Sequence, residues 1–132
     1  MTDSGLREHI LYLLGGDGAH VNFEHAIVNL PVGLRGESVE GVSHTPWRLL
    51  EHMRICQWDI LEFCTNSEHV SPEFPDGFWP NEGSPQNNAA WQKSVNGFIS
   101  DLRSMMELVA DPATDLLAQS RTAAVKRSCV AL

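Results

Sequence analysis

The side chains in this sequence best suited to chemistry are its histidines, because a neutral imidazole nitrogen can bind a divalent metal ion. There are six of them: His9, His20, His25, His44, His52 and His69. A catalytic zinc-like site uses about three protein ligands, and two ligands on one helix usually stand three or four residues apart so that they share a face. No two of these histidines have that spacing. We expect His9 and His69 to be solvated surface residues and His44 to assist the capping of a helix.

His52 stands on the most strongly patterned segment of the chain, which we expect to form one helix over residues 45–64. Thr45 suits the N-cap, and Pro46 suits the first helical position, where a missing N–H costs nothing. Apolar side chains recur with helical spacing at Leu49, Leu50, Met53, Cys56, Ile60, Leu61 and Phe63. His52 lies on or beside this stripe, where an imidazole without a partner would be costly to bury. Its partner is either a metal ion or an ordinary hydrogen-bond acceptor.

The other groups on this helix that could do chemistry have simpler interpretations. Cys56 follows His52 by about one helical turn, but a cysteine on an apolar stripe is usually a small buried hydrophobe. Asp59 and Glu62 could act as acid and base, although a solvated or salt-bridged helix face is the simpler interpretation. We therefore retain His52 as the candidate site residue.

The segments that must position these side chains are helical, because no stretch shows the alternation typical of a strand. Helices are expected over residues 6–14, 19–30 and 45–64, and from Ser84-Pro85 to residue 110. Glycine-rich residues 15–18 separate the first two helices, and Pro31 ends the second. Residues 66–85 form a long loop whose FPDGFWP segment we expect to pack over the end of a bundle. The predicted fold class is all-α, a bundle of three or four helices.

Composition and charge narrow the possible partners. With 132 residues the chain is long enough for one domain, and its net charge of -8 argues against nucleic acid or an anionic membrane as the main partner. No apolar run approaches the roughly 20 residues of a membrane span, and the acidic, polar N-terminus does not resemble a signal peptide. Cys56 and Cys64 are too far apart on one helix to form a disulfide. We expect free thiols and a cytoplasmic location.

Two motifs carry a resemblance to a known family. The chain contains HTPWRLLEHMRICQWDILEF at residues 44–63 and HVSPEFPDGFWP at residues 69–80. These resemble the DinB-like superfamily, in particular a bacterial branch with H-S-x-W-x-L-L-E-H-x-R-I-x-Q-W-D-I-L-E-F followed by H-V-S-P-E-[FW]-P-x-G-[FY]-W-P. The AHVNFEHAI and VADPATDL segments fit the same pattern, so the resemblance covers roughly residues 5–117.

The resemblance implies a DinB-like up-down four-helix bundle, often dimeric, which makes a homodimer the expected assembly. It also implies a divalent metal ion of the zinc or nickel type, held by three histidines, and in some members a low-molecular-weight thiol. One ligand comes from the helix that contains LLEHM and corresponds to His52. The other two come from an H-x-x-x-H pair on the last helix, which this sequence lacks. His20 is a weaker match on a neighbouring helix, for which a structural role is the simpler interpretation.

The chain departs from the family after Ala118. The family continues D-L-F-A-P-I-P-H-G-x-G-Q-T-L-L-R, whereas this chain ends QSRTAAVKRSCVAL, with basic residues and no acidic one. Codons for this ending exist that, after insertion of one base, translate as Pro-Ile-Pro-His-Gly-Gly-Gly-Gln-Thr-Leu-Leu-Arg. We hypothesise a frameshift, so that residues 1–118 form an incomplete bundle lacking most of its last helix and residues 119–132 form an aberrant tail.

Two functions from different classes follow. The resemblance implies a divalent-metal-dependent enzyme of the thiol-dependent transferase or hydrolase class, acting on a small molecule, with His52 as metal ligand and activity impaired by the missing pair. The alternative is a non-catalytic helical-bundle binding or interaction domain, in which His52 is a structural histidine.

Overall fold

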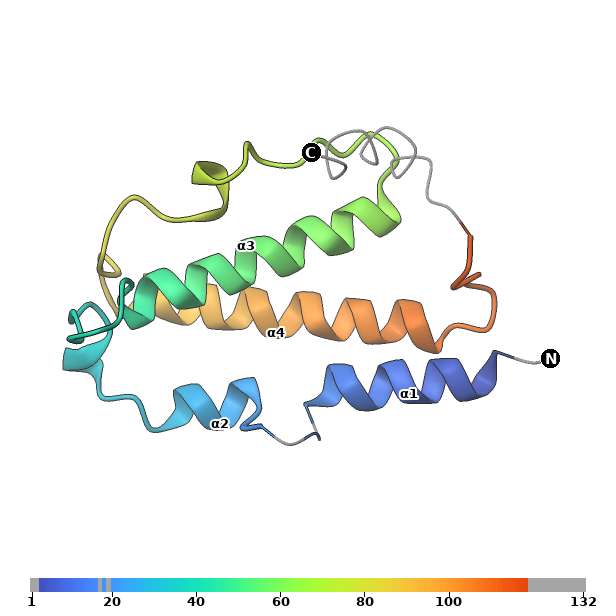
Figure 1. Ribbon diagram of the computed structural model, residues 1–132, viewed down its shortest axis with the longest axis horizontal. Coiled ribbons are helices and arrows are strands. Elements are labelled where there is room, and N and C mark those ends of the chain that lie inside the picture. Colours follow the sequence, from blue (N-terminus) through green and yellow to red (C-terminus); the bar gives the residue numbers. More distant parts are fainter. Residues whose placement is uncertain (1–2, 17, 19, 119–132) are drawn as a thin grey trace.

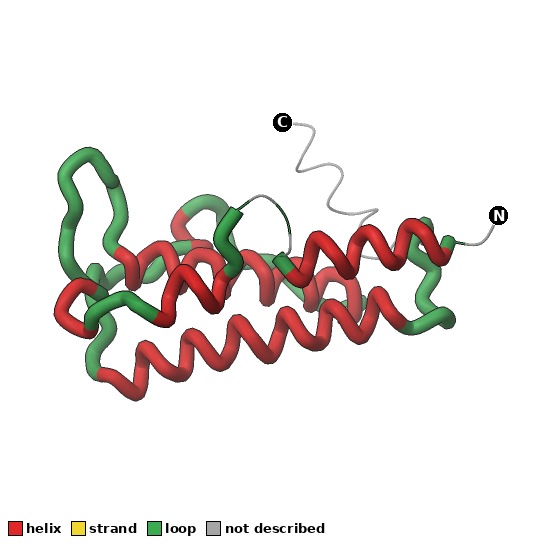
Figure 2. Tube along the Cα trace, turned by 90° about the horizontal axis from the view of Figure 1, so that it is seen from below, coloured by secondary structure: helices red, strands yellow, loops and turns green. Residues whose placement is uncertain are grey.

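The described residues of the computed structural model are 3–16, 18 and 20–118, and they form helices and loops without a strand (Figures 1 and 2). The α-helices are α1 (Ser4–Gly15), α2 (Phe23–Val28), α3 (Pro46–Thr65) and α4 (Asn88–Ala110). Two short 3₁₀ turns lie at Val32–Leu34 and Asp76–Phe78. The all-α prediction is confirmed for this part of the chain. The expectations about the tail at residues 119–132, and about a last helix there, lie outside the described residues.

Helices α3 and α4 pack side by side and run in the same direction (Figure 1). Their contacts advance together along both helices: the Glu51 carboxylate accepts from the Ser94 hydroxyl at 2.9 Å, and further along the Gln57 amide donates to the Phe98 carbonyl at 2.7 Å. The up-down order expected from the sequence therefore does not hold between these two helices. The reason is the long connection over residues 66–87, which returns the chain to the start of α3 before α4 begins.

Helices α1 and α2 run in the opposite direction along α4. Arg7 of α1 donates hydrogen bonds to the carbonyls of Val109 and Asp111 at the end of α4, both at 2.8 Å. The ring of Phe23 on α2 contacts that of Phe98 in the middle of α4, with centroids 4.0 Å apart and an interplanar angle of 30°. The two short helices thus lie end to end on one side of α4.

The ends of α1 and α2 follow local rules. Helix α1 ends at Gly15 and is capped by Gly16, whose φ of 77° is left-handed and favours glycine. Helix α2 is shorter than the expected 19–30 because the Asn22 side chain caps it, accepting from the backbone N–H of His25 at 2.9 Å. The chain therefore enters α2 at Phe23.

The ends of α3 and α4 are capped by side chains. Thr45 accepts from the backbone N–H of Arg48, as expected, and its hydroxyl also donates to the carbonyl of Gly83 at 2.6 Å. Helix α4 begins at Asn88 rather than at Ser84-Pro85, because the Asn87 side chain accepts from the N–H of Ala90 at 2.8 Å. Its end at Ala110 matches the prediction.

The core lies where α2, α3 and the first half of α4 meet. Its buried members are Trp47, Leu50, Trp91 and Val95, with Phe23, Ile27, Leu30, Ala90 and Ile99 packed around them. The apolar stripe expected on the 45–64 segment is only partly buried. Leu50 and Leu61 face the interior, whereas Leu49, Met53 and Ile60 are 41%, 44% and 55% exposed. The latter three share one face of α3, because they are four and seven residues apart.

None of the helices among the described residues combines the length and apolarity that a membrane crossing would require.

Candidate functional site

His52 lies on the side of α3 that faces the loop after the helix. Its Nδ1 atom is 2.7 Å from the carbonyl oxygen of Phe78. Because a carbonyl oxygen only accepts hydrogen bonds, Nδ1 must carry the proton. In the neutral ring Nε2 is then the nitrogen with a free lone pair. His52 is half-buried, and its hydrogen-bond partner is a backbone carbonyl.

Trp79 stacks on two histidines. The centroid of its indole lies 3.7 Å from that of the His52 ring, at an interplanar angle of 5°. It lies 4.0 Å from the centroid of the His44 ring, at an interplanar angle of 21°. The three rings join the start of α3 to the loop, so the FPDGFWP segment packs along α3. His44, which was expected to assist capping, instead uses its ring for stacking, since Thr45 supplies the cap.

Arg48 completes this contact between helix and loop. Its Nε donates to Nδ1 of His44 at 3.3 Å, and its Nη1 donates to the carbonyl of Pro80 at 2.7 Å. Its guanidinium lies 5.7 Å from the centre of the Trp79 ring, within cation–π range. Residues His44, Arg48, His52, Phe78, Trp79 and Pro80 form one cluster, which we call the His52 cluster.

Cys56 is the thiol nearest to His52. Its Sγ atom is 3.7 Å from both ring nitrogens, one turn along α3. Burial raises the pKa of the Cys56 thiol above its usual range, and the negative charge of Asp59 raises it further. The thiol is therefore protonated at neutral pH, which disfavours an activated cysteine–histidine pair.

His69 does not lie on the surface as expected. Its side chain is only 5% exposed, and its Nε2 lies 2.7 Å from Oδ1 of Asp59. Its ring makes a T-shaped contact with that of Trp58, with centroids 5.1 Å apart. The sequence prediction was wrong because the loop folds back over the helix that carries Asp59. Asp59 itself occupies a paired helix face, one of the two environments expected for it.

The three remaining histidines are exposed: His9 on α1, His20 before α2 and His25 on α2. The structure therefore brings His44 and His52 onto one indole but does not bring His20 to them. Within residues 3–16, 18 and 20–118, no three His, Cys, Asp or Glu side chains gather closely enough to hold a metal ion. The described residues thus do not supply a three-ligand site around His52, and its role as a ligand stays a prediction.

The sequence patterns did not single out Arg7 as a buried polar residue. Arg7 is buried, forms an ion pair with Asp3 at 2.6 Å and donates to backbone carbonyls at the end of α4. Arg7 has both polar and apolar neighbours on α1 and belongs to no motif, so no local pattern predicted its burial. Its role is to bind α1 to α4.

No family model, curated protein or solved structure matches this chain. The function must therefore be argued from the residues and contacts of the chain itself.

Proposed function

We propose that this chain is a DinB-like helical-bundle domain with a binding or interaction function, in which His52 is a structural histidine. The observation that supports the structural role of His52 within this proposal is the hydrogen bond from His52 Nδ1 to the Phe78 carbonyl. It supports a structural role because it gives the half-buried imidazole a hydrogen-bond partner without a metal ion.

The packing around the ring supports the same role. Trp79 covers one face of the His52 imidazole, and Arg48 ties the next residue of the loop to the same helix. A hydrogen bond of this kind contributes about 1 kcal/mol and an aromatic stack about 0.5–1.5 kcal/mol. His52 therefore serves to hold residues 78–80 against α3.

The second candidate function is that of a divalent-metal-dependent enzyme, as the DinB-like motifs imply. One observation favours it: an Nδ1–H bonded to a backbone carbonyl is the usual arrangement of a metal-ligating histidine, and it leaves Nε2 of His52 available. A bound zinc or nickel ion would polarise a substrate or activate a thiol or water. The proposal needs two further ligands, which we assign to the H-x-x-x-H helix of a frame-restored chain.

Metal analysis of two proteins separates the candidates. The 132-residue chain and a version with the reading frame restored after Ala118 are purified, loaded with zinc or nickel, desalted and assayed for bound metal. Each is also made as His52→Ala, with His25→Ala on the exposed surface of α2 as the matched control.

If His52 is structural, neither chain retains a stoichiometric ion and His52→Ala lowers only the free energy of unfolding. If the restored chain retains one ion per protomer, and His52→Ala but not His25→Ala removes it, the metal-dependent function replaces the structural proposal. Sequencing the gene tests the frameshift separately, since the bases after Ala118 must encode the family's continuation in a shifted frame.

A further inference from the structure

Residues 69–80, which we call the strap, run back along α3 after that helix has ended (Figure 1). The middle of the strap is exposed: every residue from 73 to 77 is open to solvent, and the Phe74 side chain is 84% exposed. Among the described residues, no backbone-to-backbone hydrogen bond joins the strap to a helix. The strap is therefore held against the bundle by contacts that side chains make.

These contacts form two attachments, one near each end of the strap. At its start, the His69 side chain is only 5% exposed, and its Nε2 lies 2.7 Å from Oδ1 of Asp59. At its end, the Phe78 carbonyl accepts from His52 at 2.7 Å, and the Trp79 indole stacks on the same imidazole. The two residues of α3 that hold the strap are seven positions apart, which is about 10 Å along the helix axis.

The residues between the two attachments are bonded to one another. The N–H of Gly77 donates to the Glu73 carbonyl at 2.7 Å, and the N–H of Phe78 donates to the Pro75 carbonyl at 3.1 Å. A Cβ atom added to Gly77 would lie 2.7 Å from Cβ of Pro72, so these two parts of the strap pack closely together. The strap therefore keeps bonds and packing of its own when its attachments to α3 are released.

The segments on either side of the strap are suited to act as hinges. Residues 66–68 before it and 81–83 after it are exposed. Beyond them the chain is fixed again. The N–H of Asn66 still bonds to the last turn of α3, and the Gly83 carbonyl accepts from the Thr45 hydroxyl at 2.6 Å. A movement of the strap is therefore bounded at both ends.

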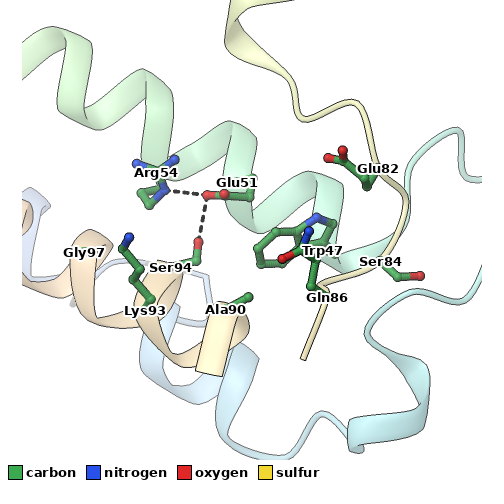
Figure 3. A pocket seen from close by; sticks show the side chains of 10 residues that line it. All are labelled: Trp47, Glu51, Arg54, Glu82, Ser84, Gln86, Ala90, Lys93, Ser94 and Gly97. Carbon is green, nitrogen blue, oxygen red and sulfur yellow. Dashed lines mark hydrogen bonds and ion pairs between the residues drawn. The ribbon is translucent and has the colours of Figure 1, made fainter. Parts of the chain in front are cut away.

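The contact between α3 and α4 does not use the strap. Trp47, Glu51 and Arg54 line a cleft between the two helices (Figure 3). There the Glu51 carboxylate accepts from Arg54 on its own helix and from the Ser94 hydroxyl on α4. The described residues that line this cleft include none from the strap. Release of the strap therefore leaves α3 and α4 joined.

We propose that the strap is a lid that opens as one unit while α3 and α4 stay packed. In the closed state it covers a row of side chains spaced four residues apart at the start of α3, namely His44, Arg48 and His52. Trp79 stacks on both imidazoles, and two strap carbonyls accept from Arg48 and His52. Opening releases these N–H donors and imidazole faces together. The strap thus controls access to this row, a regulatory role beyond the structural one proposed for His52.

Fluorine nuclear magnetic resonance on the full chain tests the proposal, because the four tryptophans divide between the strap attachments and the core. The protein is labelled with 5-fluorotryptophan, and each signal is assigned with a tryptophan-to-phenylalanine variant. Trp58 reports the first attachment and Trp79 the second, while Trp47 and Trp91 report the buried core. Relaxation dispersion and saturation transfer together cover the timescales of lid opening. We expect Trp58 and Trp79 to exchange with one rate and one open population, and the core signals to show no exchange.

Two variants are each read at the opposite end of the strap. His69→Ala should raise the open population seen at Trp79 about fivefold, and His52→Ala should raise that seen at Trp58 about fivefold, the effect of one lost hydrogen bond. His25→Ala on the exposed surface of α2 is the matched control and should change neither. Different exchange rates at Trp58 and Trp79, no change at the opposite end, or equal exchange at the core tryptophans would overturn the proposal. Absence of exchange in the wild type and in both strap variants would overturn it as well.

Discussion

The imidazole of His52 donates its Nδ1 proton to the carbonyl of Phe78, 2.7 Å away and 26 residues later in the chain. This one hydrogen bond joins the middle of α3 to the loop that crosses back over it. Because Trp79 follows directly, the same contact places the indole against the imidazole ring. The loop is thus bound to the helix through a polar and an aromatic contact at adjacent residues.

Replacement of His52 should therefore lower stability without unfolding the protein. We expect His52→Ala to reduce the free energy of unfolding by about 1–2 kcal/mol, from the lost hydrogen bond and stack. His52→Gln should recover part of this, since its amide can donate but cannot stack. Urea denaturation followed by circular dichroism measures both changes. The exposed His25→Ala is the control, and a loss as large in His25→Ala as in His52→Ala would contradict a specific role for His52.

Arg7 should be more important for stability than any exposed cation. Its guanidinium donates to the carbonyls of Val109 and Asp111 and pairs with Asp3, so Arg7→Met leaves buried acceptors unpaired. We expect a loss of about 2–3 kcal/mol. Arg7→Lys should recover only part of it, because a single ammonium cannot reproduce the planar set of donors. Urea denaturation beside Arg103→Ala checks this, and equal losses for Arg7→Met and Arg103→Ala would refute it.

The thiol of Cys56 should react slowly at neutral pH. Its pKa is raised by burial and by the charge of Asp59, and the protonated thiol is a poor nucleophile. Its alkylation rate should therefore increase at higher pH values than the alkylation rate of an exposed cysteine does. Asp59→Asn removes the nearby negative charge, lowers the pKa and moves the profile to lower pH. Iodoacetamide labelling with mass spectrometry of the Cys56 peptide measures the profile, with Glu62→Gln as the control that should leave it in place.

The exposed apolar face of α3 should drive self-association, the assembly that the proposed DinB-like family implies. Leu49, Met53 and Ile60 are all more than two-fifths exposed along this face. We expect the wild-type chain to associate as its concentration rises, and the double variant Met53→Glu with Ile60→Lys to sediment as a monomer with unchanged helicity. Analytical ultracentrifugation and far-ultraviolet circular dichroism make the comparison. A wild-type chain that is monomeric at every concentration would rule out this interface.

The sequence was sufficient for features that depend on neighbouring residues. Thr45 and Pro46 predicted the start of α3 because an N-cap acts within one helical turn. The end of α4 before Asp111-Pro112 was predicted for a similar local reason. The start of α4 was missed, since Ser84-Pro85 and Asn87 are both plausible signals and only Asn87 makes the capping hydrogen bond.

The candidate site was only partly predictable. His52 was singled out correctly as a histidine that needs a partner, but no spacing rule could name the Phe78 carbonyl as that partner. His69 was misplaced on the surface because its burial depends on the loop returning to Asp59. Contacts of this kind join residues that are distant in sequence or lie on different elements, so they leave no periodic signal.

By itself the sequence determined that the described chain is helical and where α3 begins, because periodicity and capping act over a few residues. Tertiary structure decided that α3 and α4 run parallel (Figure 1), that Trp79 stacks on His44 and His52, and that Trp47 lines a cleft between α3 and α4. The physical reason is that these features follow the path of the 66–87 connection. That path depends on which buried surfaces fit together, and a local sequence pattern cannot predict it.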